Sequence, residues 1–397
     1  MQNLKILLVH NFYQSTHIGG EDLVFEQEKN ALISALGAEN VFTYTVSNDS
    51  LQLHKISKIK LIFNIFHNIS HAKKIQALIK EHNINIMHVH NYFPLLTPSI
   101  FKAAKKAGAK VVYTLHNYRE WCLSGVLYRA DKPECFDCVK LKLPISGIKN
   151  ACYRNSRVQS FLAGLAHFYY KVNKHLDYVD RFFILSETQE KVLQKIQTPI
   201  LARAKIKPSF IDAAEGGRGT VLSAHKKNYL FVGRLESIKG IELLLEVWQN
   251  MDASYVLEII GSGPSQIALE EKYKQPNIIF LGKLPRDQVL IKMAQAKYLI
   301  HPGLVQETQG LTILEALAQG TPVVGLDIGT RQEYIQDNHN GFLCKTIDLE
   351  GNIIKSEQLF RQQPERYEML CKQAVLSSQR HLPSHITLKQ LELYRAL

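Results

Sequence analysis

Residues 307–324 read ETQGLTILEALAQGTPVV, and this stretch decides the fold class. Its apolar middle predicts a helix that stops at Gly320, and a buried strand is expected directly afterwards. Two carboxylates, Glu307 and Glu315, lie on either side of a glycine-containing turn. A buried carboxylate needs hydrogen-bond donors, and the hydroxyl groups of a ribose or a hexose supply them. Sugar chemistry is therefore the first hypothesis.

Short apolar runs alternate with helical patterns along the rest of the chain, which is typical of parallel strands joined by crossover helices. Strands are expected at residues 5–10, 41–46, 84–90, 110–115, 181–185, 229–232, 255–260, 278–281, 298–301 and 322–326. A segment rich in Pro, Ser and Gly, residues 207–219, is interpreted as a linker. Because 397 residues exceed one ordinary core, we expect two domains, over residues 1–212 and 213–384. The predicted fold class is α/β, with two Rossmann-like doubly wound domains facing across a cleft.

The composition is that of a soluble globular protein, with 46% hydrophobic and 21% charged residues. No apolar run is long enough for a membrane-spanning helix. The N-terminus enters a short strand without the pattern of a signal peptide, so we expect the protein to stay in the cytoplasm.

The net charge of +12 is confined to the first half of the chain. Residues 1–220 contain 29 Lys and Arg against 17 Asp and Glu, whereas residues 221–397 contain 19 of each kind. Such an asymmetry indicates an anionic partner for the first half, either nucleic acid or a membrane surface. A basic surface that serves only solubility is the alternative.

Two basic residues follow a predicted strand in the second half. Arg234 and Lys239 lie in the segment GRLESIKG, between that strand and the next helix. At the carboxyl end of a strand two positive charges suit a diphosphate, although basic residues in such loops are more often solvated surface. Gly310, Leu311 and Thr312 open the helix described above, where unpaired backbone N–H groups would face an anion.

Several motifs carry a family resemblance, and they follow one another along the chain in the order that the family has. The second half has GRL at 233–235, KG at 239–240, HPG at 301–303, the two glutamates, GTPVV at 320–324, GT at 329–330 and NGF at 340–342. The first half has GGE at 19–21, HVHN at 88–91 and TLHNYR at 114–119. Over nearly its whole length the chain resembles the retaining glycosyltransferases of the GT-B fold, family 4.

The resemblance implies a role for each matching position in the second half. Glu315 would bind the ribose hydroxyls of a nucleotide donor, and Glu307 would bind the hydroxyls of the transferred sugar. Arg234 and Lys239 would neutralise the diphosphate leaving group, assisted by the amides of residues 310–312. The domain over residues 213–384 would therefore hold the nucleotide sugar.

In the first half, the resemblance implies that Gly19 and Gly20 let the first loop approach the donor phosphates closely. His116 would lie across the cleft near the reacting carbon, with a structural role as the alternative. The domain over residues 1–212 would face the acceptor, and a helix at about 385–397 would cross back onto it. Catalysis is expected to need no metal or other cofactor, because Arg, Lys and helix dipoles take the part of a cation.

Two positions depart from the family pattern. Gly303 stands where the family often has Ser, and Gln309 stands where it often has an aromatic residue. Both positions could alter the sugar pocket, so the identity of the donor sugar is left open.

Four cysteines cluster shortly after His116. Cys122, Cys135, Cys138 and Cys152 follow the pattern C-x12-C-x2-C-x13-C. Four thiolates around a central C-x2-C suit a tetrahedral structural zinc. An iron–sulfur cluster and ordinary reduced cysteines are the alternatives.

Apolar residues lie beside basic ones at two places in the first half. Lys55, Lys58 and Lys60 precede the apolar segment 61–66, and a later helical pattern has Lys171 and Lys174 beside Phe161, Leu162, Leu165, Phe168, Tyr169 and Tyr170. Such a stripe is more often core than membrane face. Because the charge excess lies in the same half, we predict peripheral attachment to an anionic inner membrane leaflet.

These observations favour a retaining transferase that moves a hexosyl unit from a nucleotide-diphosphate sugar to a saccharide. The acceptor is expected to be lipid-linked, in the synthesis of capsule, exopolysaccharide or lipopolysaccharide. A nucleotide-sugar epimerase or a phosphorylase on the same fold is the first alternative. A basic protein that binds nucleic acid is the second, and it leaves the two glutamates without a role.

Overall fold

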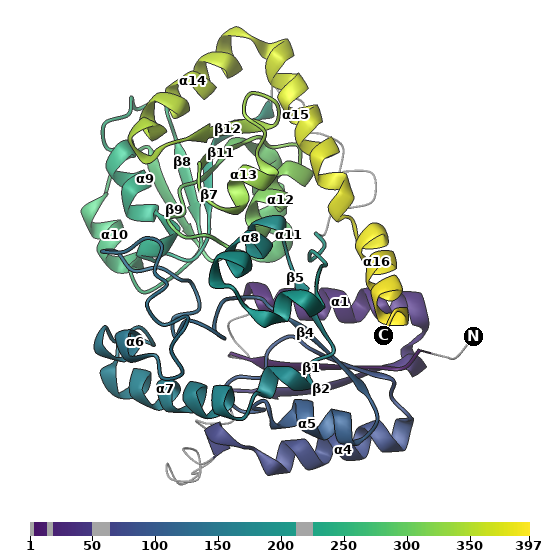
Figure 1. Cartoon of the computed structure of the whole chain (residues 1–397). Helices are drawn as coiled ribbons and strands as arrows, with labels where there is room; N and C mark the ends of the chain where they lie inside the picture. Colours follow the sequence, from purple (N-terminus) through teal and green to yellow (C-terminus); the bar gives the residue numbers. More distant parts are fainter. Residues whose placement is uncertain (1–3, 14–18, 50–63, 212–224) are drawn as a thin grey trace. The chain divides into compact units, whose positions relative to one another are not determined.

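The computed structural model describes residues 4–13, 19–49, 64–211 and 225–397 (Figure 1). The chain divides into two compact units. Unit 1 comprises Met1–Ser209 with Ser384–Leu397, and unit 2 comprises Phe210–Pro383. The sequence placed these boundaries at 212/213 and 384/385.

Unit 1 contains a parallel sheet of six strands in the order β2-β1-β3-β4-β5-β6. The strands are β1 (Ile6–Phe12), β2 (Val41–Ser47), β3 (Ile86–Val89), β4 (Lys110–Thr114), β5 (Arg181–Ile184) and β6 (Ala204–Ile206). The helices between and after them are α1 (Gly20–Leu36), η1 (Ala38–Asn40), α4 (Ile69–His82), α5 (Ser99–Lys106), α6 (Ile145–Lys149), α7 (Arg157–Val172), η2 (His175–Tyr178), α8 (Glu187–Ile196), η3 (Pro199–Arg203) and α16 (Pro383–Arg395).

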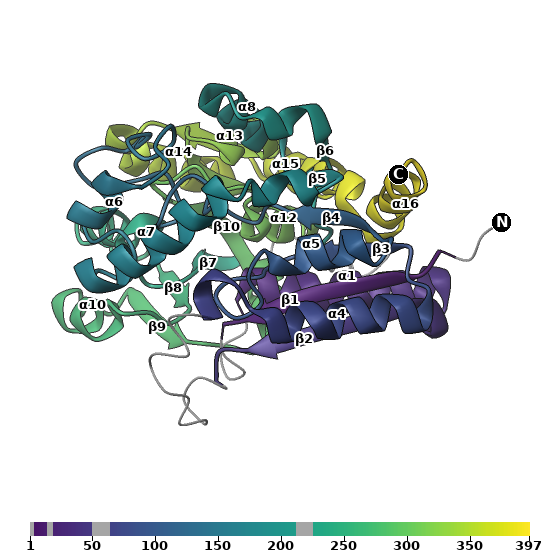
Figure 2. The same cartoon turned by 60° about the horizontal axis from the view of Figure 1, so that its bottom comes forward.

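The two faces of this sheet bury alternate residues of each strand, as the period of a β-strand requires. Ile6 and Leu8 of β1 pack in a cluster with α1 and α16, whereas Leu7 and Val9 pack in a cluster with α4 and α5. Figure 1 and Figure 2 show these helices on the two sides of the sheet. Both faces are therefore covered, as is usual for a parallel sheet.

Unit 2 repeats this architecture, with a parallel sheet in the order β12-β11-β10-β7-β8-β9. The strands are β7 (Lys227–Val232), β8 (Leu257–Ile260), β9 (Ile278–Gly282), β10 (Ala296–His301), β11 (Val323–Leu326) and β12 (Gly341–Cys344). The helices are η5 (Ser237–Lys239), α9 (Ile241–Trp248), α10 (Gln266–Lys272), α11 (Arg286–Gln295), α12 (Leu311–Ala318), α13 (Thr330–Tyr334), η6 (Thr346–Asp348), α14 (Leu349–Gln362), α15 (Pro364–Ser378) and η7 (Gln379–His381). Tyr229 and Phe231 of β7 face a cluster that includes α9 and α14, while Leu230 faces one that includes α11 and α12.

Each sheet has one point at which the strand order reverses. In unit 1 it lies between β1 and β3, and in unit 2 between β7 and β10. Ligands of doubly wound sheets bind beyond the carboxyl ends of the strands at such a point. The loops after these four strands are therefore where the candidate site residues are to be sought.

The boundary between the two units, at Ser209 and Phe210, falls within the expected linker at residues 207–219, but the described part of that segment is not an exposed connection. Lys207 is fully buried, and Ser209, Phe210 and Ile211 are also buried. The turn signals of Pro208 and its neighbours are local, whereas the burial of Lys207 depends on partners far away in the sequence. Residues 212–219 of the expected linker lie outside the described residues.

None of the helices in the described residues has the length and apolar character needed to cross a membrane.

Candidate functional site

Lys239 and Glu307 form an ion pair where the strand order of unit 2 reverses. Lys239 ends the short η5 helix after β7, and Glu307 lies in the loop after β10. The Lys239 Nζ to Glu307 Oε1 distance is 2.5 Å. The two loops are joined by a hydrogen bond of 2.9 Å from the backbone N–H of Leu304 to the carbonyl oxygen of Ile238. The structure thus brings together two of the residues that the sequence assigned to the donor site.

The Glu307 carboxylate stays ionised although it is largely buried. Burial raises its pKa, but Lys239 and then His301 outweigh that effect and hold the pKa at about 2. Nε2 of His301 lies 3.8 Å from Oε2 of Glu307. Burial lowers the pKa of His301 itself to about 4, so this imidazole is neutral at physiological pH. Glu307 is therefore a fixed hydrogen-bond acceptor beside a neutral ring.

Arg331 orients His301 by a hydrogen bond, a role that the sequence did not predict. Its guanidinium donates to Nδ1 of His301 at 3.2 Å and to the carbonyl oxygens of Leu326 and Val305 at 2.8 and 3.2 Å. Arg331 is fully buried, and burial lowers its pKa to about 10. No motif marked this residue, because its position depends on three segments that are separate in the sequence.

Glu315 is paired with Arg286, which the sequence did not assign to the site. Glu315 is 7% exposed and is the fifth residue of α12, so it lies within the helix rather than at its start. Nη2 of Arg286, at the first position of α11, donates to Oε1 of Glu315 at 2.8 Å. The one available signal was an arginine opening a helix directly after Pro285.

Glycines allow the backbone to pass close to these side chains. A Cβ on Gly240 would lie 2.0 Å from the carbonyl oxygen of Pro302, and Gly240 has a φ of +71°. Gly310 precedes α12 with a φ of +78°, and its missing Cβ would lie 3.5 Å from Oε2 of Glu307. Leu311 and Thr312 are the first two residues of α12, where backbone N–H groups have no acceptor within the helix.

Arg234 does not join this group. Its side chain is 66% exposed, and its Nε lies 3.5 Å from Oε2 of Glu236. The phosphate role that the sequence assigned to Arg234 stays a prediction.

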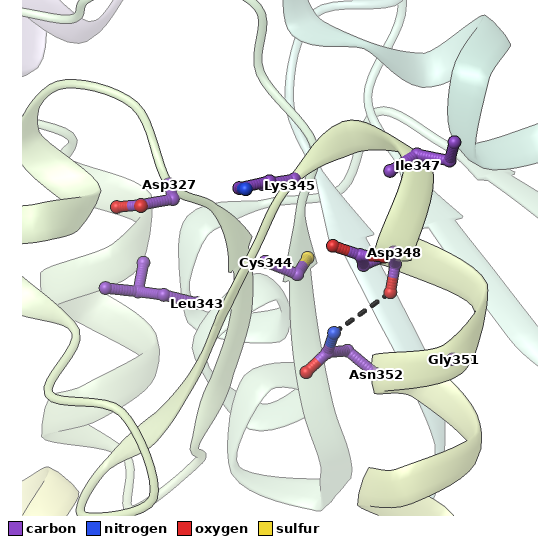
Figure 3. A pocket seen from close by; sticks show the side chains of 8 residues that line it. All are labelled: Asp327, Leu343, Cys344, Lys345, Ile347, Asp348, Gly351 and Asn352. Carbon is purple, nitrogen blue, oxygen red and sulfur yellow. Dashed lines mark hydrogen bonds between the residues drawn. The ribbon is translucent and has the colours of Figure 1, made fainter.

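A hollow of about 530 Å³ lies farther along the same edge of the sheet. It is lined by Asp327, Leu343, Cys344, Lys345, Ile347, Asp348, Gly351 and Asn352 (Figure 3). The Asn352 amide donates to the backbone oxygen of Asp348 at 2.9 Å. None of the sequence-assigned residues lines this hollow, so it is separate from the Lys239–Glu307 pair.

In unit 1, Gly19 and Gly20 lie at the start of α1, after β1. The backbone N–H of Gly19 donates to Oδ2 of Asp22 at 2.8 Å. Oδ1 of Asp22 lies 2.7 Å from Nε2 of His10, and both side chains are fully buried. A Cβ on Gly20 would meet nothing within 4 Å, so space is available beside this turn.

His116 is partly exposed and lies at the end of a chain of buried polar side chains. Its Nε2 lies 3.0 Å from Nδ1 of His90, and Nε2 of His90 lies 3.3 Å from Oε1 of Glu28. Lys207 forms a close ion pair with the other oxygen of Glu28. Burial, followed by His90 and then His10, lowers the pKa of His116 well below its ordinary value. The His116 imidazole is therefore neutral at physiological pH.

A second polar group, of partly exposed side chains, includes the residues that follow His116 in the sequence. Asn117 donates to Oε1 of Glu21 at 2.8 Å. Burial raises the pKa of Glu21, and Arg119 acts against that rise. The Arg119 guanidinium lies 5.9 Å from the ring centroid of Tyr13. Glu21, Asn117 and Arg119 belong to motifs that the sequence singled out, whereas Tyr13 does not, and their contacts were not predicted.

Among the described residues, Glu28, His88 and His90 are a group whose ligand atoms lie within 4.8 Å of one another, as a metal site requires. The buried ammonium of Lys207 already neutralises Glu28, and burial lowers the pKa of His90 to about 3. This group is therefore better explained as a stabilising hydrogen-bond network than as a metal site.

The four clustered cysteines are neighbours, but no three of their sulfurs meet that 4.8 Å criterion in the described structure. Sγ of Cys138 accepts a hydrogen bond of 3.2 Å from the backbone N–H of Gly147. Burial, and then the thiols of Cys122, Cys138 and Cys135, raise the pKa of Cys152 to about 11. The zinc assignment stays a prediction.

Residues 219–374 match the family model described as "Glycosyl transferases group 1". The chain is 24% identical over 311 residues to N-acetyl-alpha-D-glucosaminyl L-malate synthase of Bacillus anthracis. This match covers 76% of this chain and 73% of that protein. It is 34% identical over 131 residues to a GDP-mannose-dependent alpha-mannosyltransferase of Corynebacterium glutamicum, over 33% of this chain and 30% of that protein.

The crystal structure of HepE from Anabaena in complex with UDP superposes with a TM-score of 0.65 at 15% identity. That match covers 99% of this chain and all of HepE, and it confirms the predicted fold class. Residues 219–374 thus belong to the group 1 glycosyltransferases, in a chain that has the GT-B fold.

Proposed function

We propose that the protein transfers a hexosyl unit from a nucleotide-diphosphate sugar to a saccharide, with retention of the anomeric configuration, as a member of family 4. The observation that carries this proposal is the pair of buried carboxylates, Glu307 and Glu315, around the start of α12. Each is held by a cation, so each oxygen has a fixed direction toward ligand hydroxyl groups. The relatives include a GDP-mannose-dependent transferase, which supports a nucleotide-sugar donor.

On the donor side, Glu315 accepts hydrogen bonds from the ribose and Glu307 from the transferred sugar. Lys239 neutralises the diphosphate together with the amides of Leu311 and Thr312, because the N-terminus of a helix favours an anion. Arg234 is exposed and reaches the phosphates after leaving Glu236. These groups stabilise the negative charge that develops on the leaving diphosphate.

On the acceptor side, Gly19 and Gly20 let the backbone come close to the donor, and the neutral His116 lies near the reacting carbon. The bond between the anomeric carbon and the phosphate oxygen breaks while the acceptor oxygen bonds to the same face of that carbon. The departing phosphate oxygen takes the proton of the acceptor hydroxyl. No metal ion is required in this scheme.

We further propose a lipid-linked saccharide as the acceptor, in the synthesis of a cell-surface polysaccharide on the cytoplasmic side of a membrane. The basic charge of unit 1, with 30 Lys and Arg against 16 Asp and Glu, supports an acceptor presented at an anionic surface.

A thermal-shift screen against UDP-, GDP-, ADP- and TDP-sugars tests the donor site. One of these donors is expected to stabilise the protein, by about 2.7 kcal/mol at a hundredfold excess over its dissociation constant. Glu315→Ala and Lys239→Ala should each abolish that shift. The control is Glu258→Ala, which breaks a carboxylate–lysine pair with Lys292 of the same unit and should leave the shift unchanged.

If Glu315→Ala and Lys239→Ala both bind the donor normally, the site assignment is wrong. Consumption of the donor without an acceptor would favour an epimerase instead, and transfer to inorganic phosphate would favour a phosphorylase.

A further inference from the structure

Helix α7 presents an apolar stripe to the outside of unit 1. Val158, Phe161, Leu165, Phe168 and Val172 recur at intervals of three and four residues, which places them on one face of the helix. Four of them are strongly exposed, with 71% for Val158, 48% for Phe161, 40% for Phe168 and 50% for Val172. Of the residues that the sequence singled out here, Phe161 and Phe168 are exposed, whereas Tyr170 is in the core and Tyr169 packs against it.

The opposite face of α7 is the one that packs into unit 1. Its buried residues include Ala163, Gly164, His167 and Tyr170. Gly164 has no room for a side chain, because a Cβ would lie 2.9 Å from Cδ1 of Ile148 in α6. The helix therefore cannot rotate to bury its apolar stripe without losing this packing.

Helix α6 lies beside α7 and extends the exposed apolar surface (Figure 1 and Figure 2). Ile145 at the start of α6 is 48% exposed, and Leu141 just before it is 41% exposed. Of the large hydrophobic residues that are exposed in the described structure, six thus lie between residues 141 and 172.

The sequence of α6, α7 and the residues beside them carries positive charge only, and the acidic Asp137 that contacts Ser146 of α6 is paired with Arg129 and Lys132. Residues 138–176 contain seven Lys and Arg and no Asp or Glu. Six of the seven are exposed: Lys140, Lys142, Lys149, Arg154, Arg157 and Lys174. No ion pair involves any of these six in the described part of the chain, so their charges are available to an external anion.

We propose that the exposed face of α6 and α7, the lipid-binding face, docks on an anionic lipid bilayer. An amphipathic helix with aromatic and aliphatic residues on one face and flanking Lys and Arg lies in the plane of a membrane interface. The apolar side chains insert between the headgroups, while the basic side chains pair with lipid phosphates. A protein partner would need a complementary apolar and acidic surface, whereas a bilayer supplies both features without specific shape. The docking is independent of which sugar the enzyme transfers.

Docking at this face would also orient the candidate acceptor site. Nε2 of His167, in α7, is 2.6 Å from the backbone oxygen of Glu120. The Glu120 carboxylate in turn pairs with His175 at 2.8 Å and accepts from Tyr92 at 2.5 Å. Glu120 follows the segment from His116 to Arg119 directly, so these hydrogen bonds link α7 to that segment.

Flotation of the full chain with phospholipid vesicles tests the proposal. Binding is expected to vesicles of phosphatidylcholine with phosphatidylglycerol, and to fall sharply with salt or on pure phosphatidylcholine. The double variant Phe161→Ser/Phe168→Ser should bind on the order of 25-fold more weakly, about fivefold for each half-exposed ring. Lys142→Gln/Lys149→Gln should show a loss of similar size, about fivefold for each charge.

Matched variants in unit 2 control for general changes in surface chemistry. Ile347→Ser/Met369→Ser removes two hydrophobic residues that are 89% and 60% exposed, and Lys274→Gln/Lys372→Gln removes two exposed lysines. Both control variants should float like the unaltered protein.

The proposal is overturned if the unaltered protein fails to bind anionic vesicles, or if it binds neutral and anionic vesicles equally well. It is also overturned if the control variants weaken binding as much as the variants of the lipid-binding face. Donor-induced thermal stabilisation measured on the same variants separates this outcome from the proposed function. That shift should persist in every α6 and α7 variant even if vesicle binding is lost.

Discussion

At the scale of single residues, the two glutamates of unit 2 are held in different ways. Glu307 lies in a loop and depends on Lys239, with His301 and Arg331 behind it. Glu315 is fixed by its place within α12 and by Arg286 from α11. Their types and order could be read from the sequence because they belong to a compact motif. Arg286 and Arg331 could not, since each is brought to the site only by the packing of α11 or α13.

The low pKa of Glu307 predicts a pH-dependent contribution to stability. The pKa of a glutamate is about 4.3 in the unfolded chain and about 2 for Glu307 in the folded protein. The ionised Glu307 therefore stabilises unit 2 fully above about pH 4.3, and this stabilisation is lost as the pH falls toward 2. Glu307→Gln should lower the free energy of unfolding by up to about 3 kcal/mol at pH 7. The difference between the two proteins should shrink toward zero as the pH falls to about 2.

Urea unfolding of unit 2 at several pH values measures this difference. Trp248 is the tryptophan of unit 2 and Trp121 that of unit 1, so a Trp121→Phe background reports unit 2 alone. A difference that stays constant or grows in acid would contradict the assigned ion pair.

At the scale of elements, the strands and α12 could be predicted well because their patterns are local. The helix expected to stop at Gly320 is α12 (Leu311–Ala318), and the strand expected at 84–90 is β3 (Ile86–Val89). The segment between β4 and α7 could not be predicted, because its hydrophobic residues follow neither helical nor strand period. Its one helix, α6, has five residues.

This segment is held together by polar side chains around Asp137. Its carboxylate accepts from Ser146 at 3.1 Å and from Arg129 at 3.4 Å, and it forms a close ion pair with Lys132. Asp137 lies between Cys135 and Cys138, so these contacts hold the central C-x2-C in place.

The cysteine pattern predicts near-stoichiometric zinc in the purified protein, measured by mass spectrometry of the metal. Cys135→Ser/Cys138→Ser should lose the metal and unfold at a lower temperature, because a structural zinc contributes directly to folding. Cys371→Ser, which changes an isolated cysteine, should keep it. Purified protein that contains neither zinc nor iron would refute the metal site.

At the scale of the whole molecule, unit 1 is built from two stretches that are far apart in the sequence. α16 packs on the same face of the sheet as α1, with Leu391 and Tyr394 in the core cluster of Ile6 and Phe25. The Gln390 amide donates to Oε1 of Glu28 and to the Tyr394 hydroxyl, each at 2.6 Å. The buried ion pair of Glu28 and Lys207 is completed by a residue from this last helix.

We therefore expect Gln390→Ala to destabilise unit 1 by about 1–3 kcal/mol, since Glu28 loses a buried donor. Urea unfolding of the Trp248→Phe background, followed by Trp121 fluorescence, measures unit 1. Leu388→Ala on the exposed side of α16 should change the free energy of unfolding by no more than about 0.5 kcal/mol. An unchanged stability of unit 1 in Gln390→Ala, or a loss of stability in unit 2 instead, would show that this hydrogen bond does not stabilise unit 1.

The return of α16 to unit 1 has a consequence for biosynthesis. Ser384 is made 175 residues after Ser209, so at about 5–20 residues per second the ribosome needs roughly 10–35 seconds to bridge that gap. During this interval the apolar side chains that α16 will cover, on α1 and the central strands, have no partner. The nascent chain thus offers chaperones a binding surface that the finished protein no longer has.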